Sequence, residues 1–180
     1  MVVKDIIFSY LEAQESQKPL RLDTSWLAVG HVDEFLQFIP ANNTRGWVEV
    51  MSDPSLAIKI LEEKEKAGHG SIPAISRKNE NQWPQYCEMP ECLQPINSIT
   101  VSQLLSNRRL RRLNNMCDRK INSTIKILKR EVGLTDEDII RIPSLFIEDQ
   151  PSKSKVGALF PAVVNNLVLT GYNPCVAPNP

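Results

Sequence analysis

The sequence predicts a mixed α/β domain, with helices on the outside of small sheets. Between residues 101 and 132, apolar side chains recur at intervals of three and four, which predicts a long amphipathic helix. Residues 47–51, Trp-Val-Glu-Val-Met, follow the alternating pattern of a buried strand. Helical and strand-like segments follow one another along the chain, which is the pattern of a mixed domain.

Composition and charge are those of an ordinary soluble protein. The 180 residues are 42% hydrophobic and 23% charged, with 21 basic and 21 acidic side chains. A net charge of zero gives no argument for binding nucleic acid or a membrane surface. No apolar run approaches the roughly 18 residues that span a bilayer, and the first seven residues do not have the pattern of a signal peptide.

The four cysteines are Cys87, Cys92, Cys117 and Cys175, and their spacing matches no zinc site. Scattered cysteines without a secretory signal favour reduced thiols and a cytoplasmic location. Cys87 and Cys92 lie close together in a proline-rich loop, where oxidation would let them pair.

The first half of the chain is expected to contain two helices and two strands. Residues 3–14 predict a helix, 20–23 a short strand and 47–51 the buried strand. Ser52 or Asp53 is expected to cap the next helix, which ends at residues 68–70 and buries the stripe Leu56, Ile60 and Leu61.

The second half begins with a predicted surface insertion at residues 71–98, which is rich in proline and asparagine. The long helix follows, with a break near Asn107 and a stop at Gly133. Residues 139–143 and 162–169 predict strands, and residues 144–155 between them predict a loop. Basic residues line the outer face of the long helix and are expected to be solvated: Arg109, Arg112, Arg119, Lys120, Lys126 and Arg130.

The stretch from Trp26 to Pro40 carries the candidate chemistry. It places His31 and Asp33 two residues apart in an apolar run, behind Gly30. In an extended segment these two side chains would share a face, where an imidazole beside a carboxylate forms an acid/base pair. Asp33 is also expected to cap a short helical turn through residues 35–38. Taken alone, a His-x-Asp pair in an apolar run is more often structural than catalytic, and His69 between two glycines is expected to be a loop residue.

Residues 26–36, Trp-Leu-Ala-Val-Gly-His-Val-Asp-Glu-Phe-Leu, resemble a catalytic-domain segment of the protein-arginine deiminases. Further segments resemble that family in the same order, and together they cover nearly the whole chain, with residues 71–98 the poorest fit. They are residues 68–70, 105–107, 128–134, 138–146, 160–161 and 164–169.

The resemblance implies part of a five-module α/β propeller of the pentein type, built from ββαβ units. It also implies calcium-dependent hydrolysis of peptidyl-arginine to citrulline and ammonia, with a protein or peptide carrying an exposed arginine as substrate. In this reaction a cysteine thiolate attacks the guanidinium carbon, ammonia leaves, and water resolves the covalent intermediate. A homodimeric parent is compatible with the resemblance.

By the same resemblance, His31 is the general acid/base, Asp33 is one of two guanidinium-binding aspartates, and Val29 is part of the apolar wall along the arginine. The nucleophilic cysteine is expected beyond Pro180, so Cys175 is not assigned that role unless it contacts His31. The second aspartate and the calcium ligands are expected before Met1. We therefore expect an inactive fragment that binds calcium weakly if at all. The alternative is a non-catalytic remnant that acts as a scaffold or protein-binding module.

Overall fold

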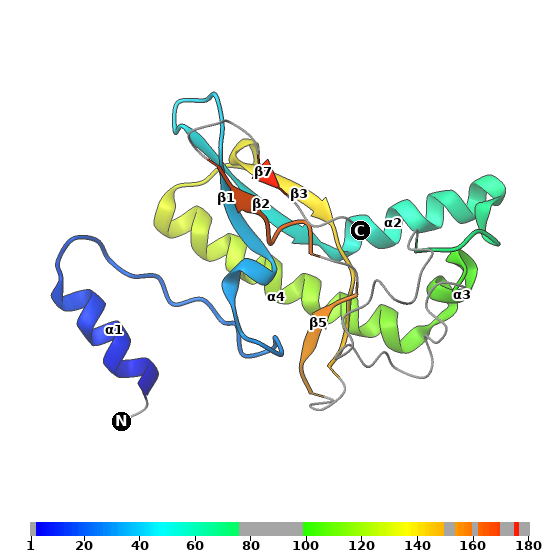
Figure 1. The fold of residues 1–180 in the computed structure, drawn as a ribbon, viewed down its shortest axis with the longest axis horizontal. Coiled ribbons are helices and arrows are strands. Elements are labelled where there is room, and N and C mark those ends of the chain that lie inside the picture. Colours follow the sequence, from blue (N-terminus) through cyan, green and yellow to red (C-terminus); the bar gives the residue numbers. More distant parts are fainter. Residues whose placement is uncertain (1–2, 76–98, 150–153, 160–161, 170–174, 177–180) are drawn as a thin grey trace.

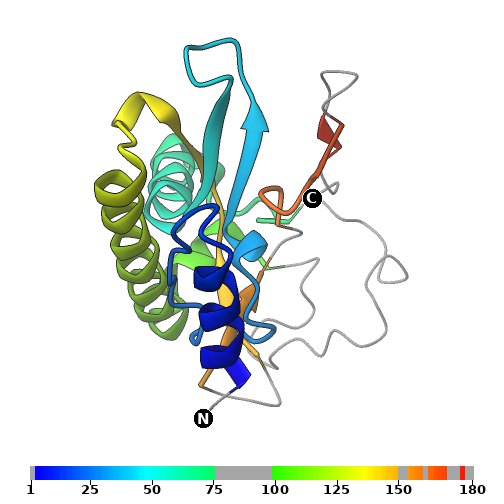
Figure 2. The same cartoon turned by 90° about the vertical axis from the view of Figure 1, so that its left-hand side faces the viewer.

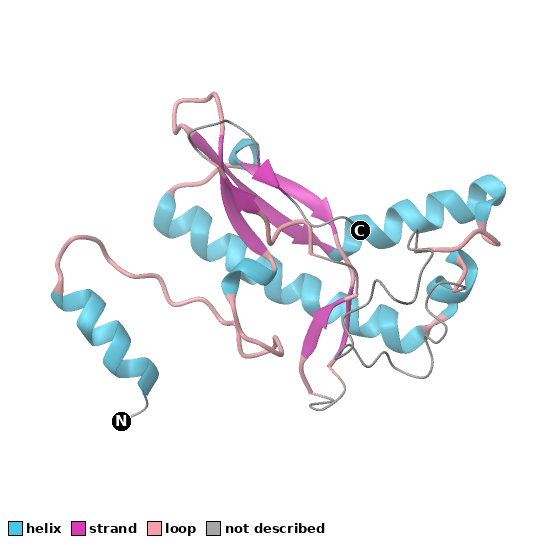
Figure 3. Cartoon of the chain, in the orientation of Figure 1, coloured by secondary structure: helices cyan, strands magenta, loops and turns pink. Residues whose placement is uncertain are grey.

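The computed structural model describes residues 3–75, 99–149, 154–159, 162–169 and 175–176. Within these ranges helices and strands combine in one mixed α/β arrangement, as predicted (Figure 3). The predicted insertion at residues 71–98 lies largely outside the described residues. Its near ends are joined, because Ala74 N donates to Ile99 O at 2.8 Å. No described helix is long and apolar enough to cross a membrane.

A three-stranded sheet lies at the centre. β1 (Leu36–Pro40) runs antiparallel to β2 (Trp47–Asp53), and β2 runs parallel to β3 (Ile139–Pro143). The parallel pair requires a long crossover, and the described residues of this crossover form three α-helices. Figure 2 shows α2 and α4 on one side of the sheet and the short strands β6 (Leu167–Val168) and β7 (Cys175–Val176) on the other.

Side-chain caps fix the ends of the crossover helices. Asp53 caps α2 (Pro54–Lys64), where its Oδ1 accepts the Leu56 N–H at 2.8 Å. A π-helical turn, Glu65–His69, follows α2. Asn107 separates α3 (Val101–Ser106) from α4 (Arg108–Val132) and caps α4, and Gly133 ends α4 in the left-handed conformation. The predicted break near Asn107 and the predicted helix end at Gly133 are therefore confirmed.

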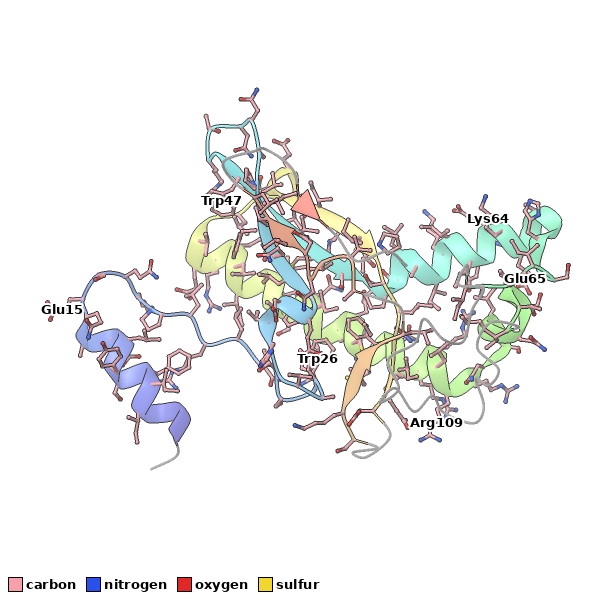
Figure 4. All side chains as sticks on the ribbon, in the orientation of Figure 1. Glu15, Trp26, Trp47, Lys64, Glu65 and Arg109 are labelled. Atoms are coloured by element: carbon pink, nitrogen blue, oxygen red, sulfur yellow. The ribbon has the colours of Figure 1, made fainter. Side chains whose placement is uncertain are left out.

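The main core lies between the sheet and α4. Met51 from β2 packs there against the buried stripe of α4, which includes Cys117, Ile121 and Leu128. In Figure 4, Trp26 lies at the lower end of the main core, and Trp47 lies at its upper end near the hairpin of β1 and β2. The Trp26 ring contacts those of Phe35 and Phe146, at centroid distances of 5.4 and 5.6 Å.

A second core cluster joins α2, α3 and the start of α4 to a small two-stranded sheet. This sheet pairs β4 (Phe146–Glu148) with β5 (Val156–Ala158). Asn114, buried in α4, holds it in place, because its Nδ2 donates to Phe146 O at 2.9 Å and its Oδ1 accepts from Phe146 N at 2.8 Å. At the exposed end of α4, Arg109 pairs with Glu148 (Figure 4).

The first helix, α1 (Val3–Ala13), stands apart from the sheet on an extended linker (Figure 1). Its bounds confirm the predicted helix at residues 3–14. Ile6, Ile7 and Tyr10 on this helix are 51%, 53% and 65% exposed, so its apolar face is not covered by the described residues.

Several local predictions are wrong. Residues 20–23 form no strand, since no neighbouring strand pairs with them; Leu20 and Leu22 instead pack against the main core. The predicted loop 144–155 contains β4. Of residues 162–169 only Leu167 and Val168 form a strand, because a turn occupies residues 163–165. On α2, Ile60 is 37% exposed and Ala57 is buried in its place.

Candidate functional site

His31 and Asp33 lie on a short 3-10 turn at the edge of the main core. The turn, η1, spans Val32–Glu34, and His31 precedes it as the N-cap residue in an extended conformation. The backbone N–H of His31 donates to Glu34 Oε1 at 2.9 Å. This bond links the N-cap residue to the last residue of the turn and holds the backbone that carries the His31 and Asp33 side chains.

The structure corrects the predicted backbone of this segment. A 3-10 helix turns by roughly 120° per residue, so the alternation of an extended strand does not apply to Asp33. Asp33 does not cap the turn, and strand β1 begins at Leu36 where the helical turn was expected to continue. Pairing with β2 accounts for this, because Leu36 is in register with buried Met51.

Packing and backbone hydrogen bonds hold the η1 turn on both sides. Phe35, which follows it, is fully buried against Trp26, and Phe35 O accepts the Ser52 N–H at 2.9 Å. On the preceding side, Ala28 N donates to Val156 O at 2.8 Å, which ties the segment to β5. Gly30 has φ +84°, a conformation that favours glycine, and it allows the chain to bend into the turn.

The predicted site residues differ in exposure. His31 is exposed, Val29 is 67% exposed, and Asp33 is half-buried. An imidazole and a carboxylate that are open to solvent on a fixed turn can meet an incoming ligand. An ionised carboxylate accepts two parallel hydrogen bonds from a guanidinium, and an apolar side chain such as Val29 packs along an alkyl stem.

Two of the four cysteines, Cys117 and Cys175, lie in the part of the chain that the structure describes. Cys117 is fully buried in α4, and burial raises the pKa of its thiol to about 12, which makes it a poor nucleophile. Cys175 lies in β7, and its exclusion as the nucleophile stays a prediction. Cys87 and Cys92 lie outside the described residues, as does any pairing between them.

Metal-ligating side chains are also dispersed across the part of the chain that the structure describes. No group of three or more His, Cys, Asp or Glu side chains comes together there. Calcium takes six to eight oxygen ligands, usually with several carboxylates, so the described residues do not fit a calcium site.

Sequence reasoning missed an unusual acid among the described residues. Glu49, on the central strand β2, is fully buried, and neither of its carboxylate oxygens has a hydrogen-bond partner. Burial raises its pKa to about 7, and the charge of Arg141 offsets part of that rise. An available signal was the apolar run on either side of Glu49, because a strand with apolar residues at successive positions is buried on both faces, as residues 48–52 are here.

The chain matches one protein family along almost its whole length. The family model described as protein-arginine deiminase matches residues 2–180. Human protein-arginine deiminase type-3 is 36% identical over 167 residues, covering 93% of this chain and 23% of the relative. Human type-4 is 36% identical over 163 residues, with 89% and 22% covered, and mouse type-1 is 31% identical over 167 residues, with 93% and 22% covered.

The chain thus spans less than a quarter of the length of these relatives. The match includes the His31 turn, the central sheet and the crossover helices, because it extends over residues 2–180. The chain belongs to the protein-arginine deiminase family.

Proposed function

We propose that the His31 turn is part of a protein-arginine deiminase site, which converts peptidyl-arginine to peptidyl-citrulline and ammonia. The observation that carries this proposal is an exposed histidine and a half-buried aspartate on one closed turn, in a chain of this family. The relatives named above are protein-arginine deiminases, which supports a protein or peptide substrate.

Each residue has a role that suits its chemistry. Asp33 would hold the guanidinium through paired charge-assisted hydrogen bonds, for which a carboxylate is suited. His31 would donate a proton to the leaving nitrogen and accept one from the attacking water, since an imidazole can act as acid and base. Val29, which is exposed, would pack along the methylenes of the arginine side chain.

The other parts of the reaction are proposed to come from elsewhere in the parent protein. These are the attacking cysteine, the second guanidinium-binding aspartate and the calcium ligands; among the described residues, no group of three or more metal-ligating side chains comes together. The three-stranded sheet and its crossover helices would form part of a pentein-type propeller in a cytoplasmic parent. On this view the 180-residue chain binds the guanidinium weakly and produces no citrulline by itself.

Binding to the isolated chain tests the proposal. Nα-benzoyl-arginine amide, a small analogue of peptidyl-arginine, is titrated into the labelled chain while backbone amide signals are followed by NMR. We expect the His31 and Asp33 signals to shift, and Asp33→Asn to weaken binding about tenfold because a charge-assisted pair is lost. Asp136→Asn is the control, since Asp136 is an exposed acid that pairs with Lys129. Equal binding by both variants would contradict the proposal.

A non-catalytic binding module is the second candidate, and the exposed apolar face of α1 favours it. A citrulline assay on the parent protein separates the two candidates. Production that depends on His31 supports the enzyme, whereas a parent that binds protein partners through α1 and yields no citrulline supports the binding module.

A further inference from the structure

A cavity adjoins the η1 turn, since Glu34 of that turn lines it. Its volume is about 260 Å³, and its walls include Ile142, Leu145, Phe146 and Val163. The cavity is at the carboxyl ends of the parallel strands β2 and β3. Crevices beyond the carboxyl ends of parallel strands are a common position for ligand sites in α/β proteins.

Two polar groups interrupt this apolar lining. Ser52, near the end of β2, is 1% exposed, and its Oγ is buried without a hydrogen-bond partner. Glu34 contributes the second group, a carboxylate whose Oε1 already accepts the His31 N–H. A buried hydroxyl without a partner costs folding free energy, so a ligand that bonds to Ser52 would remove that cost.

The charge and size of the cavity define the class of ligand. Glu34 is the one charged side chain among the described residues that line it, which favours a cation or an N–H donor. The apolar walls suit a body the size of one ring, since a cavity of about 150 Å³ lined by apolar side chains accepts benzene. We propose that this cavity binds a small aryl-alkyl amine, with its ring against Phe146 and its ammonium between Glu34 and the Ser52 hydroxyl.

Glu34 connects this cavity to the turn that carries His31. A ligand ammonium on Glu34 would share the carboxylate with the backbone N–H of His31, three residues earlier in the chain. Ligand binding should therefore be visible at His31 although the ligand does not occupy the position proposed for arginine.

The probe for this site is 2-phenylethylamine, titrated into the 180-residue chain and followed by NMR amide shifts. We expect saturable shifts at Ser52, Leu145 and Glu34, with an affinity in the millimolar range that suits a ligand of this size. Ala162→Leu, which fills the cavity, should abolish these shifts. Ala13→Leu makes the same change on exposed α1 and should leave the shifts intact, which controls for the substitution itself.

Two further comparisons test the polar contacts. Ser52→Ala should weaken binding about five- to tenfold, and 2-phenylethanol should bind at least tenfold more weakly than the amine. The proposal is overturned if the lining residues do not shift at about 20 mM amine, a concentration above the expected range, or if Ala162→Leu binds as well as the unsubstituted chain. Equal binding of the alcohol and the amine would overturn the assigned ligand class. The arginine-analogue experiment reports on Asp33, so either proposal can fail without the other.

Discussion

Replacement of Glu49 by glutamine should stabilise the protein above neutral pH. Glu49 is fully buried between the sheet and α4, and both of its carboxylate oxygens are without partners. Its pKa is raised from 4.5 to about 7, with burial the largest cause. One pKa unit corresponds to about 1.4 kcal/mol, so well above pH 7 the buried charge costs the folded state about 3 kcal/mol.

The sign of the pH dependence follows from the raised pKa. The folded protein holds the Glu49 proton more tightly than the unfolded chain does, so the folding free energy from this group is fully present below pH 4.5. It is lost as the pH rises through about 7. Carboxyl groups whose pKa is lowered in the folded protein, such as that of Asp138, titrate below this window and do not obscure it.

Urea unfolding followed by circular dichroism at pH 5.0 and pH 8.5 measures the effect. Glu49→Gln and the unsubstituted chain should differ by under about 1 kcal/mol in free energy of unfolding at pH 5.0, because Glu49 is then neutral in the folded protein and ionised only in the unfolded chain. At pH 8.5 the variant should be more stable by about 2 to 3 kcal/mol. Glu137→Gln removes an exposed acid and serves as the control. If Glu49→Gln changes stability equally at both pH values, Glu49 does not carry a buried charge and this reasoning is refuted.

Two further substitutions test packing and hydrogen bonding, both read from unfolding free energies. Gly70→Ala should cost about 1 kcal/mol, the low end for overpacked sites, because its Cβ would clash with Ser102 Oγ and that short side chain must rotate away. Adding Ser102→Ala should restore most of that loss, and a double variant no more stable than Gly70→Ala would contradict the clash. Asn114→Ala should cost about 2 to 3 kcal/mol, since it leaves the buried N–H and C=O groups of Phe146 without their Asn114 partners. The exposed neighbour Asn115→Ala should cost under about 0.5 kcal/mol, and equal losses at the two sites would show that the Phe146 bonds contribute little.

The crossover helices could be predicted from the sequence because their boundaries depend on local chemistry. Asp53 followed by proline begins α2, Asn107 interrupts the helical pattern, and Gly133 ends α4. The caps act within four residues of the helix end, so a single sequence contains the whole signal.

The small strands could not be predicted because their formation depends on contacts made in three dimensions. Residues 20–23 alternate in the manner of a strand but pair with no strand, whereas β4 forms because β5 lies beside it and Asn114 bonds to Phe146. Strand formation depends on side-chain packing and on a partner strand, neither of which is visible in a short window of sequence.

At the candidate site, the sequence identified the residues but not their geometry. His31 and Asp33 were selected from their chemistry and from a family resemblance, and their roles stay predictions. The expected extended backbone was wrong, because the bond from His31 N to Glu34 Oε1 closes a 3-10 turn. The buried Glu49 was missed because a carboxylate in a strand is ordinarily expected on the exposed face.

The central claim is that the carboxylate of Asp33 binds a guanidinium. The most direct measurement is a crystal structure of the chain soaked with Nα-benzoyl-arginine amide. We expect two guanidinium nitrogens within about 3 Å of the Asp33 carboxylate oxygens, with the arginine methylenes against Val29. A guanidinium bound elsewhere, or bound in the same place in Asp33→Asn crystals, would contradict it.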